Sequence, residues 1–145
     1  MRRRSLLSLL VPAAGFLMAG EAGKSPVKLR GRLMVPEEEG EATLQTAEGK
    51  RVPLHGDEQT EKVLHDKRLD GWDFEVHGQY GADGRFEILP IHLAALFTYQ
   101  DGRFLRVTYY CDVCAIRTYS PGICMCCREE TRVDAVTPET VTSGK

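Results

Sequence analysis

The residues with the clearest chemical potential are the five cysteines, which all lie between positions 111 and 127. Cys111 and Cys114 form one C-x-x-C pair, and Cys124 and Cys127 form a second. Residues 120–122, Ser-Pro-Gly, are turn formers that can fold one pair back onto the other. Four thiolates that converge from two such pairs suit a tetrahedral site for a soft metal ion. The sequence therefore predicts a metal centre whose ligands are these two pairs.

Cys126 is the additional cysteine, and the spacing leaves its role open. It can be a free thiol, a group beside the ligands, or a ligand in place of Cys127, because Cys124-x-Cys126 is also a workable chelate. Two other states of the cysteines remain alternatives, namely structural disulfides, which oxidising compartments favour, and thiol redox chemistry. The odd number of cysteines is a mild argument against a framework made only of disulfides, because one thiol would be left over.

The two cysteine pairs resemble the knuckles of zinc-ribbon and rubredoxin-type sites, over about residues 108–130. The resemblance implies zinc or iron, and thiolates also accept an iron–sulfur cluster or Cu(I). We expect zinc, because no second cofactor motif accompanies the cysteines. A zinc ion closed off by four thiolates has no open position for substrate, so such a site would be structural.

No other residue pattern indicates catalysis. The four histidines, at positions 55, 65, 77 and 92, show neither H-x-x-x-H nor H-E-x-x-H spacing, so each is expected to be an ordinary histidine. His77 and His92 fall on segments that could pair as strands, which leaves a small metal site there as an alternative. The sequence also lacks a P-loop, a dinucleotide fingerprint, G-x-S-x-G and C-x-x-C-H. A non-catalytic binding or assembly module is therefore favoured over an enzyme, with a redox or metal-handling protein as the alternative.

Residues 1–22 are predicted to be an export signal. Three arginines at positions 2–4 precede an apolar stretch at 6–19, and small residues at Gly20 and Ala22 suit cleavage after Ala22. The apolar stretch is shorter than the about 20 residues that a membrane span needs. No cysteine that could carry a lipid anchor follows the stretch directly. We therefore expect an exported protein, periplasmic or extracellular, with no membrane span in its mature chain.

The start of this segment, Arg3-Arg4-Ser5-Leu6-Leu7, resembles a twin-arginine export signal, although a leucine stands where phenylalanine is common. An ordinary secretory signal is the alternative. The resemblance implies export of a folded protein that already holds its cofactor. The cysteines could then take up metal before they reach an oxidising compartment, where disulfides would compete.

The charge balance argues against a nucleic-acid partner. The chain has 19 basic and 21 acidic side chains, a net charge of −2. Removal of residues 1–22 takes away three arginines and one glutamate, which leaves 16 basic and 20 acidic side chains, or −4. Proteins that bind phosphate backbones normally carry a basic surplus. The partner is therefore expected to be a protein or a small molecule.

The segments that must position the cysteines mostly alternate apolar and polar residues, as half-buried strands do. Strands are expected at the following segments: 27–34, 42–46, 50–54, 72–76, 85–89 and 104–110. Gly31 indicates a bend in the first strand, and a short helix is expected between residues 57 and 69, capped by Asp57 or Thr60. Residues 90–97 fit a strand or a helix.

This order of elements resembles the OB fold over residues 26–97, although other small β-rich folds fit nearly as well. The resemblance implies a closed five-stranded barrel whose helix fills one end between strands three and four. We thus expect a mainly β protein, a small OB-like barrel with one short helix and a C-terminal zinc-ribbon-like hairpin. The predicted parts are a signal at 1–22, the barrel at 23–103, the cysteine-rich hairpin at 104–131 and a disordered tail at 132–145.

Overall fold

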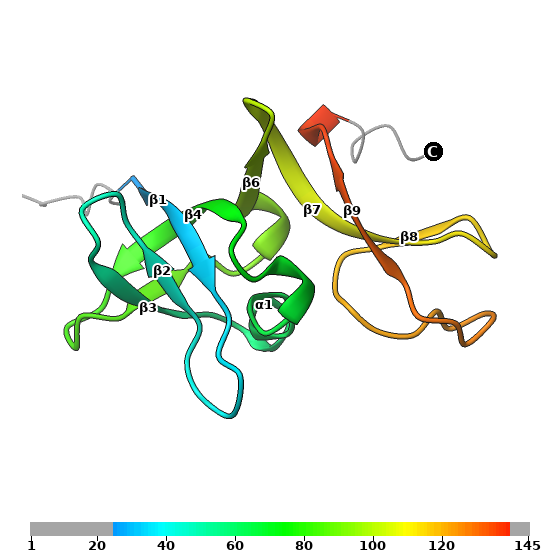
Figure 1. The fold of residues 1–145 in the computed structure, drawn as a ribbon, viewed down its shortest axis with the longest axis horizontal. Coiled ribbons are helices and arrows are strands. Elements are labelled where there is room, and N and C mark those ends of the chain that lie inside the picture. The colour runs from blue at the N-terminus through cyan, green and yellow to red at the C-terminus, as the bar shows by residue number, and fades with distance from the viewer. Residues whose placement is uncertain (1–24, 140–145) are drawn as a thin grey trace, which may run out of the picture.

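The computed structural model describes residues 25–139 and confirms a mainly β protein (Figure 1). The predicted export signal lies outside the described residues, as does the end of the predicted tail from residue 140. Within the described range, no helix combines the length and the apolar character that crossing a membrane requires.

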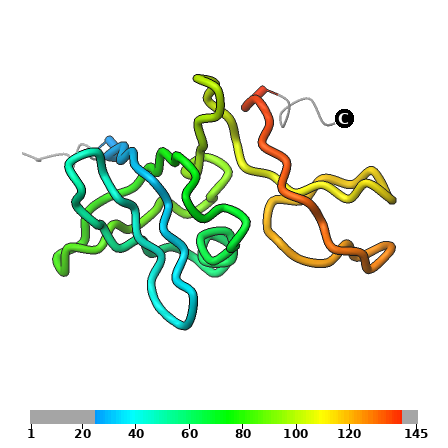
Figure 2. The backbone as a smooth tube through the Cα atoms, in the orientation of Figure 1, coloured from blue at the N-terminus to red at the C-terminus, as the bar shows by residue number. Residues whose placement is uncertain are grey.

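The N-terminal part of the chain is a closed barrel of five short strands, as predicted. The strands are β1 (Val27–Met34), β2 (Thr43–Gln45), β3 (Arg51–His55), β4 (Asp73–Tyr80) and β5 (Phe86–Ile88). They pair in the order β1-β2-β3-β5-β4, and β4 pairs again with β1 to close the circuit (Figures 1 and 2). The pairing of β3 with β5 is parallel and the other pairings are antiparallel. This is the OB-like arrangement that the order of elements indicated.

Gly31 lies at the bend where β1 stops pairing with β4 and begins to pair with β2. β1 pairs with β4 as far as Arg32, and from Arg32 onward it pairs with β2. A Cβ atom on Gly31 would lie 2.3 Å from the backbone oxygen of Gln45, a distance that real side chains do not tolerate. Only glycine lets the two strands approach this closely, which confirms the bend predicted from the sequence.

The predicted helix lies between β3 and β4 and packs into the barrel core. Helix α1 (Glu58–Leu64) begins after Asp57, whose carboxylate accepts a hydrogen bond from the Thr60 N–H at 2.8 Å. A short 3-10 helix, η1 (Lys67–Leu69), follows it. Val63, Leu64 and Leu69 are buried in the same cluster as the inward-facing residues of the barrel strands. The helix therefore contributes to the barrel core.

A continuous run of strands connects the barrel to the cysteines. After a short 3-10 helix, η2 (His92–Ala94), strand β6 (Leu96–Gln100) pairs with β4, and β7 (Arg103–Cys111) pairs with β6. Asp101 and Gly102 both have positive φ, 50° and 74°, as a two-residue hairpin turn requires. The predicted boundary between residues 103 and 104 therefore falls at the start of β7, beside a tight turn and within a sheet that continues from β6 to β7.

The predicted disordered tail is wrong at its beginning. Residues 132–136 form strand β9 (Arg132–Val136), which pairs antiparallel with β7 (Figure 1). A shorter strand, β8 (Ile116–Thr118), pairs with β7 next to the cysteines. β9 pairs along one edge of β7, and its Val133 side chain packs against the hydrophobic core. The alternation of polar and apolar residues in Arg-Val-Asp-Ala-Val signals this strand, whereas the polar composition indicated a tail.

Candidate metal centre

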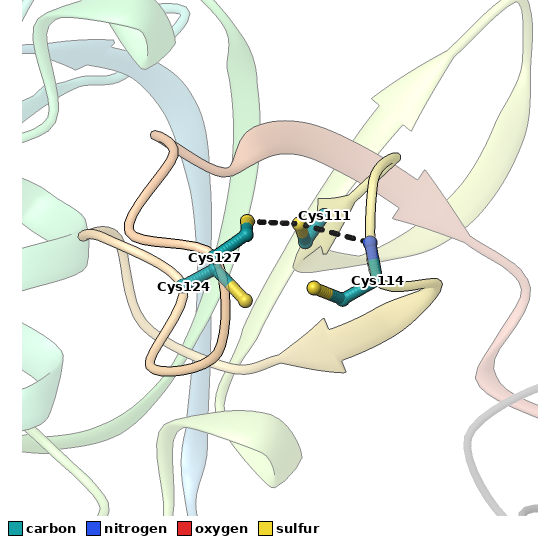
Figure 3. A group of neighbouring side chains, drawn as sticks. All are labelled: Cys111, Cys114, Cys124 and Cys127. Carbon is teal, nitrogen blue, oxygen red and sulfur yellow. Dashed lines mark hydrogen bonds between the residues drawn. The ribbon is translucent and has the colours of Figure 1, made fainter.

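The structure brings the four predicted ligands together at one end of β7 (Figure 3). Cys111 ends β7 and Cys114 lies in the turn before β8, while Cys124 and Cys127 lie in the loop between β8 and β9. Their sulfur atoms all lie within 4.8 Å of one another, and those of Cys111 and Cys127 are 3.4 Å apart. Tetrahedral zinc with Zn–S bonds of about 2.3 Å places its sulfurs about 3.8 Å apart. The four thiols therefore fit around a single ion.

The two cysteine pairs have matching backbone conformations. The N–H of Cys114 points at the sulfur of Cys111 at 3.5 Å, and the N–H of Cys127 donates in the same way to Cys124. The residue after each pair is left-handed, with φ of 53° at Ala115 and 66° at Arg128. Glycine is the usual residue in this conformation. The sequence therefore carried no local signal for the two turns.

The second cysteine pair is held in a small closed loop. The N–H of Cys124 donates to the Glu129 carbonyl at 2.8 Å, and the N–H of Arg128 donates to the Cys124 carbonyl at 2.9 Å. At the base of the loop, the N–H and the hydroxyl of Thr131 both donate to the Gly122 carbonyl. These backbone contacts fix where Cys124 and Cys127 point.

Side chains from the barrel and the sheet hold the base of the centre. Arg68, beside α1, donates to the Thr131 carbonyl at 2.7 Å, and His92 in η2 contacts the Tyr119 carbonyl. Arg117 on β8 bridges to Asp134 on β9, with a nitrogen–oxygen distance of 2.7 Å. Sequence reasoning did not identify these residues, because nothing in their local pattern indicates contacts with distant backbone.

Exposure differs among the five thiols. Cys111 and Cys124 are each 2% exposed, Cys114 and Cys127 are half-buried, and Cys126 is exposed. All five are free thiols in this structure. The cluster thus has an inner edge protected by the fold and an outer edge open to solvent, where Cys126 lies.

Local contacts shift the pKa values of two thiols in opposite directions. Hydrogen bonds from the N–H groups of Cys127 and Cys126 lower the pKa of the Cys124 thiol to about 7. The pKa of the Cys114 thiol is raised, chiefly through its contact with the Cys126 thiol and then through desolvation. Crowded thiols cannot all ionise without a cation to share their charge. The Cys114 thiol therefore keeps its proton near neutral pH in the metal-free centre.

This ionisation predicts proton release on metal binding. Zinc added to the reduced metal-free protein at pH 7 should release between about three and four protons per ion, because thiolates bind only after they lose their protons and the Cys124 thiol is already partly ionised. Zinc affinity should then fall by about 10³- to 10⁴-fold per pH unit below 7. Calorimetry in buffers of different ionisation enthalpy, with chelator competition at pH 6 and 7, measures both quantities. Cys126→Ser should release the same number of protons. Release of fewer than about one proton would contradict the four-thiolate site.

The four histidines do not gather at one site. His55 and His65 both lie near Glu61, and His77 contacts Glu75 at 2.7 Å. His92 itself lies in η2 and not on a strand, although the residues that follow it, from Ala95 onward, pair with β4 beside His77. Over residues 25–139, the four cysteines are the only cluster of possible metal ligands.

The outer surface of the barrel carries a shallow pocket beside the bend at Gly31. Its lining combines two arginines, one aspartate and uncharged residues of β1, β2 and the loop before β4, namely Arg30, Gly31, Arg32, Gln45, Thr46, Ala47, Gly71 and Asp73. Arg30 pairs with Asp73 at 2.8 Å, so part of this charge is internally balanced. The lining combines polar and apolar groups, and Arg32 is the one charge beyond the Arg30–Asp73 pair. One such charge is little for a phosphate backbone.

No protein-family model, curated protein or solved structure matches the chain.

Proposed function

We propose that this chain is an exported, non-catalytic binding or assembly module, in which an OB-like barrel is joined to a structural zinc site. The observation that carries the proposal is the convergence of four cysteine sulfurs within 4.8 Å of one another. The proposed ligands are Cys111, Cys114, Cys124 and Cys127, with Cys126 beside them. Matching backbone turns at the two pairs support a preformed metal site.

Zinc is the metal that best suits a structural role here. Soft thiolates select zinc, iron or Cu(I) over hard cations such as Mg²⁺ and Ca²⁺. Four protein ligands complete the tetrahedral preference of zinc and leave no position for substrate. An ion at this place would join the end of β7 to β8 and to the loop before β9. β8 has only three residues, none of them buried, so it has little apolar packing of its own.

Metal analysis of the purified protein tests the proposal directly. One zinc per chain and no visible absorption are expected. Visible absorption together with iron would instead support a rubredoxin-like or iron–sulfur centre, because zinc thiolates and disulfides are colourless. Native protein that contains no metal and shows two disulfides by mass would refute any metal site.

A redox or metal-handling protein that uses the same cysteines is the second candidate. The exposed thiol of Cys126 favours it, since that thiol lies next to the proposed ligand Cys127 at the solvent-exposed edge of the cluster. A purely structural site has no need of an additional reachable thiol. Tightly held zinc that survives in the Cys126→Ser variant would favour the structural role.

The proposed partner is a protein or a small molecule, and nucleic acid is a poor candidate. The support is the acidic net charge together with the pocket beside Gly31, where Asp73 pairs with Arg30 and Arg32 is the one further charge. Electrostatic attraction to phosphate dominates most nucleic-acid binding, and this surface offers little of it.

The proposed export route predicts the effect of changing the two arginines. Replacing Arg3 and Arg4 with lysine should leave the precursor in the cytoplasm, because the twin-arginine route reads the arginine pair. Fractionation and immunoblotting of the full chain measure the ratio of precursor to processed protein. Lysine keeps the positive charge that the general secretory route requires. Export that continues unchanged would therefore point to the secretory route.

A further inference from the structure

We propose that Cys126 is a peroxide-sensitive thiol that forms a disulfide with Cys114 and thereby opens the metal centre. The inference rests on the proposed zinc site and adds a modification site to it. Its starting point is the fifth thiol of the cluster, which a closed four-thiolate site does not use.

Exposure decides which thiols a small oxidant reaches. Cys126 is exposed and Cys114 is half-buried, whereas Cys111 and Cys124 are each only 2% exposed. Oxidation of thiols follows their accessibility as well as their thiolate character. Attack by peroxide should therefore begin at Cys126 and spare the inner edge of the cluster.

Proximity then decides the disulfide partner. The sulfur of Cys114 lies within 4.8 Å of the sulfur of Cys127, the residue next to Cys126 in the chain. Cys127 itself is adjacent to Cys126, and a disulfide between neighbouring residues strains the backbone. Because Cys111 and Cys124 are buried, Cys114 is the remaining accessible partner.

The reaction is a two-electron oxidation by hydrogen peroxide. The Cys126 sulfur attacks one peroxide oxygen, so that an S–O bond forms, the O–O bond breaks and hydroxide leaves. The Cys114 thiolate then leaves the metal and attacks the sulfenic sulfur, so that the S–S bond forms and a second hydroxide departs. The two sulfurs supply two electrons. The two hydroxides become water by taking one proton from the original Cys126 thiol and one from solvent.

The disulfide weakens the metal site by removing one ligand. Cys111, Cys124 and Cys127 remain, and three thiolates no longer close the tetrahedron around zinc. Cys114 lies between β7 and β8, so its withdrawal frees the turn that joins them. Oxidation would therefore release zinc and loosen this end of the sheet in one step.

Metal release from the zinc-loaded full chain tests the proposal. Hydrogen peroxide is added, zinc is followed with a chromogenic chelator, and the disulfide is located by peptide mass mapping. The wild-type chain should form the 114–126 disulfide and release its zinc, whereas Cys126→Ser should hold zinc and release it at least about tenfold more slowly. Dithiothreitol followed by fresh zinc should restore the loaded protein.

Met125→Leu is the matched control, because Met125 is 97% exposed beside Cys126 and also reacts with peroxide. This variant should release zinc at the wild-type rate. Equal release from Cys126→Ser and wild type, a disulfide between other cysteines, or loss of zinc binding in Cys126→Ser would each overturn the proposal. If the reduced wild-type chain binds no zinc, the proposed function fails. Disulfide mapping of the metal-free protein then still decides whether Cys126 pairs with Cys114.

Discussion

Serine in place of Cys111, Cys114 or Cys124 should abolish stoichiometric metal binding. Each substitution removes one of four mutually close thiols, and a serine hydroxyl does not replace a thiolate as a ligand for a soft ion. The binding free energy of a small structural zinc site is largely folding free energy. Residues 112–131 should therefore lose their ordered conformation, because β8 is short and the loop after it is held mainly by backbone contacts.

Limited proteolysis and metal analysis measure this result. Trypsin should cut the variants after Arg117 and Arg128 much faster than it cuts the zinc-loaded wild type. The barrel should keep its secondary structure by circular dichroism, because its core is formed mainly by residues of β1–β5 and α1. Cys126→Ser is the matched control and should retain metal. If Cys126→Ser lost metal and Cys127→Ser kept it, the fourth ligand would be Cys126.

Leu64→Ala should lower the free energy of unfolding by about 2–5 kcal/mol, through lost burial and the cavity left behind. Leu64 is fully buried on the inner face of α1 and belongs to the core cluster of the barrel strands. Dense packing at this position leaves the neighbours little freedom to collapse into the space. The helix should remain formed, because alanine favours helix and the Asp57 cap is untouched.

Urea denaturation of the zinc-loaded protein measures this loss. Gln59→Ala, on the exposed side of the same helix, is the matched control and should change the free energy of unfolding by less than about 0.5 kcal/mol. A loss for Leu64→Ala as small as that of the control would mean that the helix contributes little to the barrel core.

The sequence by itself determined the local elements of this protein. Alternation of apolar and polar residues located the barrel strands, and one of the two candidate caps, Asp57, begins the helix. Gly31 marked the bend of β1. These features depend on neighbours a few residues away, so local chemistry encodes them. The spacing of the cysteines likewise indicated which four could share an ion.

Tertiary structure decided the features that depend on distant partners. β9 exists because β7 offers an edge with which residues 132–136 can pair, and composition alone indicated a tail. β6 joins the barrel to the cysteine-rich end because it lies between β4 and β7.

The arrangement of the thiols was decided in the same way. Ala115 and Arg128 have a left-handed backbone conformation, which neither residue type predicts. The convergence of Cys111 and Cys114 with Cys124 and Cys127 arises only when the two segments fold together. Pairing and packing between distant segments select such conformations, because the free energy that they supply outweighs local preference.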